Sequence, residues 1–148
     1  MAKQNIHLFF GEDSFQMKEK LILWKKEFKK KYEGDLNLET IEGKNIKAAD
    51  IIESAKTIPF LAEKKLLIVV NFLKTSKDTE SKKLLEFLEG EIPSHAVIVF
   101  QEDEVPDKRK SLYKKISKLG NTHEFKHMSP AEMAKWVHEK GKGKIEYN

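Results

Sequence analysis

The first stretch whose residue types could do chemistry is NIHLFFGEDSFQMKEKLILW, residues 5–24. An apolar run ends at Gly11, a few polar residues follow, and a helical pattern then begins, which is the layout of a phosphate-binding loop. The full pattern, G-x-x-x-x-G-K-[ST], uses glycines for close approach of backbone N–H groups and a lysine to neutralise phosphate. Counted from Gly11, its last three places hold Gln16, Met17 and Lys18. The stretch therefore predicts the backbone of a nucleotide-binding fold without the residues that would bind the nucleotide.

The residues that would hold magnesium and activate water are missing as well. The apolar run LLIVV is followed by Asn71 and Phe72, where a hydrolytic P-loop enzyme would place carboxylates. The five histidines show no metal-ligand spacing on a shared helix face, the chain has no cysteine, and no G-x-S-x-G motif occurs. We therefore predict no catalytic residue, no metal site and no cofactor.

Composition and charge define the class of protein. The 148 residues are 39% hydrophobic and 35% charged, which suits one main hydrophobic core. Nothing resembles a signal peptide or a membrane-spanning run, so we predict a cytoplasmic protein without a membrane partner. The net charge of +4 comes from mixed basic and acidic residues, with Arg109 as the only arginine. A lysine surface can attract nucleic acid without sequence preference, although solvated lysine faces are the plainer interpretation.

Hydrophobic periodicity predicts alternating strands and helices. The five predicted strands are residues 6–10, 36–41, 66–70, 96–100 and 122–125. The first helix would bury Met17, Leu21, Trp24 and Phe28, with Asp13 or Ser14 as its N-cap. The other apolar faces are Ala48, Ile51, Ile52 and Ala55; Leu84, Leu85 and Leu88; and Leu112, Ile116 and Leu119, with Asp107 as the cap of the last helix.

The character of the strands predicts the fold. The runs KLLIVV and AVIVF carry no polar alternation, so both of their faces must be covered, as in parallel strands between two helical layers. We predict an α/β fold with three layers and an open, mostly parallel, five-stranded sheet joined by right-handed crossovers. The run LNLETI alternates more and is expected at an edge.

The sequence changes character after Phe125. The stretch MSPAEMAKWVHEK has the pattern of a helix start, with Ser129 as N-cap, Pro130 at the first helical position, Glu132 completing a capping box, and Met128 with Met133 as a hydrophobic staple. The apolar stripe of this helix has nothing after it in the chain to bury it fully. We interpret residues 128–148 as the opening of a second, helical module; a further helix packed on the sheet is the alternative.

The stretch TIPFLAEKK places two large apolar residues in a short connection. Pro59 ends the preceding helical pattern because a proline biases the residue before it away from the α region. Phe60 and Leu61 then precede the third strand, although connections normally run over the surface. The pair is either a plug packed under the sheet or an exposed anchor for a partner's pocket. An anchor of this kind contributes about 1.5 to 3 kcal/mol per side chain when it enters a dry pocket.

An ordered set of stretches resembles the amino-terminal part of the delta subunit of bacterial DNA polymerase III, a component of the sliding-clamp loader. The stretches are HLFFGEDSF, LNLETIEG, AKTIPFLAEKKLLIVVN, VIVFQEDEVPDKRKSLYKKI and EFKHMSPAEMAKWV, and the similarity extends to about residue 140. The resemblance implies an AAA+-like domain without a functional nucleotide site at residues 1–127 and the beginning of a small helical lid domain at residues 128–148. The family's carboxyl-terminal collar domain would be absent, leaving under half of the complete subunit.

The resemblance also implies a function. The delta subunit is a non-catalytic part of a DNA-directed DNA polymerase holoenzyme; it binds the ring-shaped beta sliding clamp and holds one interface open. Its contact consists of two adjacent bulky hydrophobic residues, which fall on Phe60 and Leu61, with Pro59 and Ala62 setting the turn and Ile58 buried. The implied partners are the beta clamp, the gamma/tau and delta prime subunits through the missing carboxyl-terminal region, and DNA indirectly or weakly.

Two other functions remain open from the sequence. One is an intact P-loop NTPase, which tight ATP binding would reveal through increased thermal stability. The other is a sequence-independent DNA-binding module that uses the lysine-rich helix KKEFKKKY, residues 25–32, and binds less tightly as salt increases.

Overall fold

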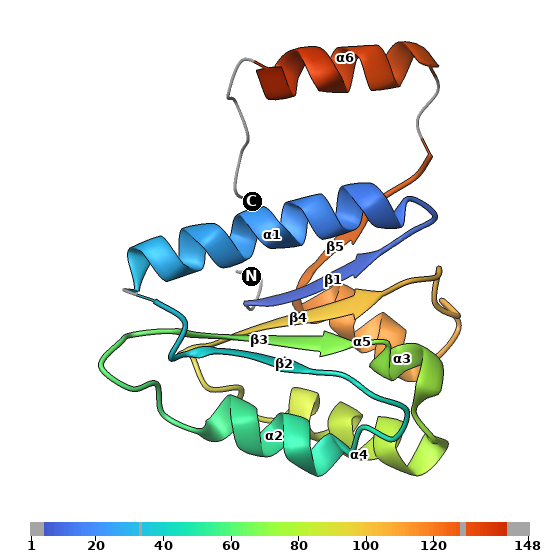
Figure 1. The fold of residues 1–148 in the computed structure, drawn as a ribbon. Helices are drawn as coiled ribbons and strands as arrows, with labels where there is room; N and C mark the ends of the chain where they lie inside the picture. The colour runs from blue at the N-terminus through green and yellow to red at the C-terminus, as the bar shows by residue number, and fades with distance from the viewer. Residues whose placement is uncertain (1–4, 33, 128–129, 142–148) are drawn as a thin grey trace.

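The protein is an α/β fold of three layers around a parallel sheet (Figure 1). The structure is a computed structural model that describes residues 5–32, 34–127 and 130–141. Its elements are β1 (Ile6–Phe10), α1 (Ser14–Lys31), β2 (Leu38–Ile41), α2 (Ala48–Lys56), β3 (Lys65–Val70), α3 (Phe72–Thr75), α4 (Asp78–Glu89), β4 (Ala96–Glu102), α5 (Ser111–Leu119), β5 (Asn121–Glu124) and α6 (Pro130–Gly141). The predicted strand-helix alternation is confirmed.

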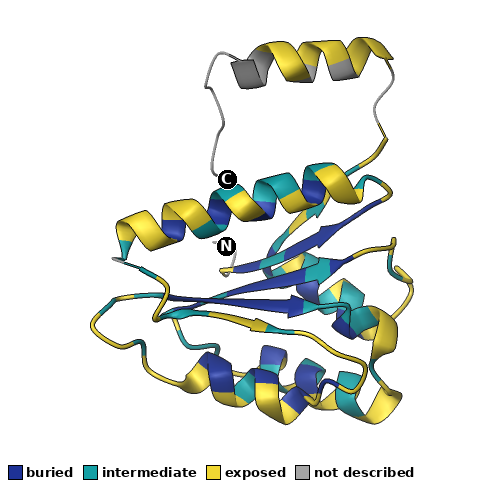
Figure 2. Ribbon diagram, in the orientation of Figure 1, coloured by how far each residue is buried: buried dark blue, intermediate teal, exposed yellow. Residues whose placement is uncertain are grey.

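All five strands run parallel, in the order β2-β3-β4-β1-β5. The sheet was predicted to be mostly parallel, and every pairing in the described residues is parallel. The central strands are buried on both faces, as the unbroken apolar runs predict. Figure 2 shows this burial as dark blue strands between the helical layers. The strand β2 lies at an edge and is only partly buried, which confirms the prediction from its alternation.

The two helical layers cover opposite faces of the sheet. On one side lies α1, which packs Met17, Leu21, Trp24 and Phe28 against Phe9 and its neighbours. On the other side, α2, α4 and α5 bury the predicted faces, with Ile51, Leu84, Leu88, Leu112 and Ile116 in the core. Burial of such a side chain contributes about 1.5 to 3 kcal/mol. The lysines near Phe28 point to solvent, in line with the plainer interpretation of the basic run in α1.

The sequence missed one helix and misplaced one cap. The four residues of α3 directly follow Asn71 and bury Phe72, but they are too few to show a helical period. Asp107 was predicted to cap the next helix, and this prediction is wrong, because α5 begins at Ser111 with Lys110 as its N-cap. Asp107 instead closes the turn before the helix, where it accepts hydrogen bonds from the backbone and guanidinium of Arg109.

The helix α6 begins at Pro130, as predicted. Ser129 and Met128 lie outside the described residues, as do the side chains of Met133 and Trp136, so the capping box and the staple stay predictions. Val137 is exposed. The division into domains at residue 127 likewise stays a prediction. None of the helices in the described part of the chain is both long and apolar enough to cross a membrane.

Candidate functional site

The loop after β1, residues 11–13, is filled by the protein's own backbone. Gly11 has φ +146°, and a Cβ atom at this position would lie 2.2 Å from the carbonyl oxygen of Phe125. The backbone N–H of Phe125 donates to Phe10 O at 2.8 Å, and the N–H of Asp13 donates to Phe125 O at 3.0 Å. The glycine therefore allows the backbone of the segment after β5 to pack closely against this loop.

The N-terminus of α1 already carries an acceptor from the protein. The Asp13 carboxylate accepts from Gln16 N at 3.0 Å and from Gln16 Nε2 at 2.7 Å. These hydrogen bonds hold the pKa of Asp13 below its usual range. Met17, at the lysine position of the phosphate-loop pattern, is completely buried. A phosphate at this helix end would face a carboxylate and find no lysine at that position.

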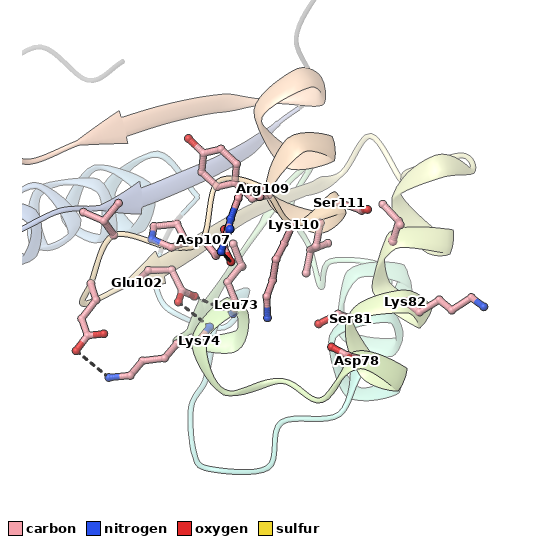
Figure 3. A pocket seen from close by; sticks show the side chains of 16 residues that line it. Leu73, Lys74, Asp78, Ser81, Lys82, Glu102, Asp107, Arg109, Lys110 and Ser111 are labelled. Atoms are coloured by element: carbon pink, nitrogen blue, oxygen red, sulfur yellow. Dashed lines mark hydrogen bonds and ion pairs between the residues drawn. The ribbon is translucent and has the colours of Figure 1, made fainter.

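Polar side chains at the carboxyl ends of β3 and β4 form hydrogen bonds with nearby residues of the protein, mostly with backbone groups. Asn71, in the left-handed region at φ +58°, exchanges hydrogen bonds of 3.0 and 2.9 Å with Asp103. The buried Glu102 carboxylate accepts from the backbone N–H groups of Leu73 and Lys74, both at 3.1 Å, and so caps α3 (Figure 3). Burial raises the pKa of Glu102 to about 7, although both hydrogen bonds act in the opposite direction.

A cavity of about 730 Å³ lies beside Glu102, among the ends of α3, α4 and α5 (Figure 3). Its rim carries both signs of charge: Lys74 pairs with Glu104 at 3.2 Å, and Arg109 pairs with Asp107 at 3.1 Å. Within the part of the chain that the structure describes, no cluster of three side chains is arranged to hold a metal ion. The cavity therefore selects no particular ligand class by its charge.

The segment between α2 and β3, residues 57–64, displays apolar side chains, and we call it the Phe-Leu loop. Phe60 is 62% exposed and Leu61 is 88% exposed, so the pair is not a plug under the sheet. Pro59 is half-buried beside them. The expectation that Ile58 is buried is wrong, since its side chain is 80% exposed. Ile58 has the spacing of the buried face of α2, but the helix ends at Lys56 and the face does not extend to it.

The backbone of the Phe-Leu loop has a fixed, unusual shape. Leu61 has φ +54°, a left-handed conformation that costs a non-glycine residue about 1 to 2 kcal/mol. The Asn37 side chain donates to Phe60 O and accepts from Phe60 N, and both hydrogen bonds are 2.7 Å long. Sequence reasoning missed Asn37, because it lies 23 positions before its partner and no periodicity links the two.

Two lysines attach the carboxyl end of the Phe-Leu loop to neighbouring segments through hydrogen bonds. Lys64 Nζ donates to Ser94 O at 2.6 Å. The next residue, Lys65, is buried; its Nζ donates to Ser54 O at 2.6 Å and lies 3.7 Å from Glu39 Oε1. Large apolar side chains on a tethered loop can enter a cavity of another protein without much rearrangement of the backbone.

Two of the histidines form a structural pair beside α1. His7 Nδ1 and His123 Nε2 lie 3.2 Å apart, on adjacent strands β1 and β5. Burial lowers the pKa of each to about 4, and the charge of Lys20 acts in the same direction. Both rings are therefore neutral at pH 7.

Comparison with known proteins identifies the family. A family model described as DNA polymerase III, delta subunit, matches residues 7–126, and no curated protein sequence matches. The fold is similar to the DNA clamp loader delta protein of Bacillus subtilis, with 23% identity and a TM-score of 0.74, over 95% of this chain and 44% of that protein. It is also similar to a DNA polymerase III gamma subunit-related protein of Thermotoga maritima, with 18% identity and a TM-score of 0.57, over 93% of this chain and 46% of that one. This chain thus spans less than half the length of either. With most of its length matched by the family model, the chain belongs to the DNA polymerase III delta subunit family.

Proposed function

We propose that this chain is the clamp-binding part of a clamp-loader subunit, which docks on the beta sliding clamp through Phe60 and Leu61 and helps to open the ring. The observation that carries the proposal is the exposure of these two adjacent side chains, 62% and 88%, on a tethered loop. The position of the pair just before β3 is the position that the family resemblance assigns to the clamp contact. In the full subunit, assembly with gamma/tau and delta prime subunits would use regions outside this chain.

The burial of exposed apolar side chains can supply the binding free energy of this proposed contact. Ile58, Phe60 and Leu61 form a run of exposed apolar side chains interrupted only by Pro59. Clustered exposed apolar side chains of this kind mark interaction sites on soluble proteins. Transfer of Phe60 and Leu61 into a partner's pocket would contribute about 1.5 to 3 kcal/mol each. Two such anchors are typical of the few residues that dominate an interface.

We also propose that the subunit acts without binding or hydrolysing ATP. Support comes from the loop after β1, where Asp13 and Phe125 use the helix N-terminus and the space beside Gly11. Further support comes from Met17, which lies in the core at the lysine position. A thermal-shift titration with ATP and magnesium checks this part, and an increase in melting temperature with ATP concentration would contradict it.

The test of clamp binding is a double variant, Phe60→Ala with Leu61→Ala, and a beta clamp from the same source. We expect the affinity, measured by surface plasmon resonance, to fall by at least about a hundredfold, because both anchors are removed. Urea unfolding is expected to stay close to that of the parent, since both side chains are exposed in the free chain.

A matched control is available on α1. Phe15 and Ile22 are 63% and 61% exposed. They lie on α1, which covers the face of the sheet opposite to α2. The variant Phe15→Ala with Ile22→Ala removes a similar apolar surface and is expected to keep clamp affinity. Unchanged affinity in the Phe-Leu variant would overturn the proposed site. Equal losses in both variants would show that apolar surface in general, not this loop, drives association.

A further inference from the structure

We infer that Asn37 is a positioning residue for the clamp contact, and that Leu36 beside it widens the apolar surface offered to the clamp. The inference rests on the proposed function and adds two residues to which neither the motif nor the family resemblance assigns a role. They lie directly before β2, on a different segment from the Phe-Leu loop.

The Asn37 amide satisfies the backbone of one anchor residue completely. Its Nδ2 donates to the carbonyl oxygen of Phe60 and its Oδ1 accepts from the N–H of Phe60, both at 2.7 Å. This pair of bonds imitates the exchange between two residues of adjacent antiparallel strands. Phe60 is thereby held as if it were part of a sheet, although it lies in an irregular loop.

Asn37 is itself attached to the rigid sheet. Its backbone carbonyl accepts from the N–H of Leu66 at 2.8 Å, next to the first residue of β3. The following residue, Leu38, is paired with Leu66 in the parallel register of β2 and β3. The side chain of Asn37 therefore fixes Phe60 relative to the sheet. Phe60 directly precedes Leu61, the residue with positive φ.

A fixed loop binds more tightly than a mobile one, because less conformational freedom is lost on association. The left-handed backbone of Leu61 makes this effect specific, since the free chain would otherwise favour other conformations at a leucine. Asn37 and Lys64 attach the loop on either side of Leu61. We therefore expect Asn37 to act on affinity through the shape of the loop and not through a contact of its own.

Only an amide has the required chemistry at position 37. An aspartate of the same shape keeps the acceptor for Phe60 N but lacks the donor, and it would place a carboxylate against the carbonyl oxygen of Phe60. Alanine removes both hydrogen bonds. These two variants separate the donor from the acceptor.

Leu36 provides the second half of the inference. Its side chain is 74% exposed, and it directly precedes the residue that holds Phe60. With Ile58, Phe60 and Leu61 it brings four large apolar side chains to this corner of the molecule, each more than half exposed. A clamp surface that fits this corner has an apolar rim beside the cavity that receives the anchor pair.

The first measurement needs no clamp. Hydrogen exchange of the Phe60 amide, followed by NMR, is expected to be at least about tenfold faster in Asn37→Ala than in the parent, because its acceptor is lost. The amides of β3 serve as internal controls and should keep their protection. Unchanged exchange at Phe60 would overturn the role of Asn37, whatever the clamp does.

The second measurement is clamp affinity. We expect Asn37→Ala and Asn37→Asp each to weaken binding about tenfold, and Leu36→Ala to weaken it about threefold, with urea unfolding nearly unchanged. In the Phe60→Ala background, Asn37→Ala should have a smaller effect than in the parent, because the two act through one loop. Equal effects in both backgrounds would contradict positioning, and an unaffected affinity in Leu36→Ala would remove Leu36 from the surface.

The outcomes keep the inference and the proposed function apart. If the double alanine variant of the anchors still binds the clamp, the proposed function fails, while the exchange of the Phe60 amide still reports on Asn37. If that double variant loses binding and Asn37→Ala retains it, the proposed function stands and the positioning role is overturned.

Discussion

Among the positions with positive φ, those in the loop after β1 and in the Phe-Leu loop serve opposite purposes. In the loop after β1, Gly11 at φ +146° lets the backbone of Phe125 come so close that no side chain would fit. In the Phe-Leu loop, Leu61 adopts φ +54° although a glycine would do so more easily, and its side chain is exposed. The comparison teaches that a positive φ has a different use in each loop: at Gly11 it allows close packing of backbone, and at Leu61 it accompanies an exposed side chain.

The largest expected effect is a loss of stability at the contact between Gly11 and Phe125. Gly11→Ala should destabilise the fold by more than about 3 kcal/mol, because it combines an unfavourable φ with a clash against backbone that cannot move freely. Urea unfolding followed by circular dichroism measures it.

Gly43→Ala is the matched control for Gly11→Ala. Gly43 has a nearly identical φ of +141°, but an added Cβ would meet no atom within 4 Å. We expect this variant to cost about 1 kcal/mol, the contribution of the backbone conformation alone. Equal destabilisation by the two variants would contradict a close-packed junction at Gly11.

An intermediate effect on stability is expected when acid protonates the histidine pair on β1 and β5. The folded-state pKa values of His7 and His123 are about 4, below the usual histidine value of 6.5, so the unfolded chain binds more protons between these limits. The contribution of the pair to stability is therefore fully present above pH 6.5 and is lost as pH falls toward 4. Thermal unfolding between pH 7 and 4.5 should show this loss.

The variant His123→Gln isolates the contribution of the pair. Glu102, whose pKa is raised to about 7, acts in the opposite direction, because its contribution decreases as pH rises from about 4.5 through 7. Glu102 is common to parent and variant, so the difference between their profiles belongs to the histidines. We expect a flatter profile in the variant, and parallel profiles would argue against a neutral histidine pair.

The smallest effect on stability is expected in the Phe-Leu loop. Leu61→Gly should change the free energy of unfolding by less than about 1 kcal/mol, because relief of the left-handed strain offsets the added freedom of the unfolded chain. The same variant should lose at least about tenfold in clamp affinity, because it removes one anchor. A large loss of stability would show that Leu61 supports the fold, and the contrast between the two loops would fail.

Much of the fold could be predicted from residue patterns. Unbroken apolar runs identify β3 and β4 as central strands, and the four-three-four spacing of Met17, Leu21, Trp24 and Phe28 identifies the buried face of α1. These patterns succeed because burial on a regular element repeats with its period. The helix α3 has four residues and one buried side chain, so it shows no repeat.

The candidate site was predictable only in part. The pair Phe60 and Leu61 was singled out because two large apolar residues in a short connection are unusual; both are exposed, and their role stays a proposal. The exposure of Ile58 was missed, because the family resemblance implied burial, whereas α2 ends at Lys56 and its buried face does not extend to this residue. Asn37 and Glu102 were missed for a different reason: their partners are backbone groups of distant segments, and backbone groups carry no residue-specific signal.

The complete burial of Met17 restricts which residues position 17 can accept. A lysine placed there would bring a charge into the packed layer beneath α1, and the chain would unfold before it gained a nucleotide. Substitutions in the exposed Phe-Leu loop, by contrast, leave the core intact, so the two regions differ in how freely their residues can change.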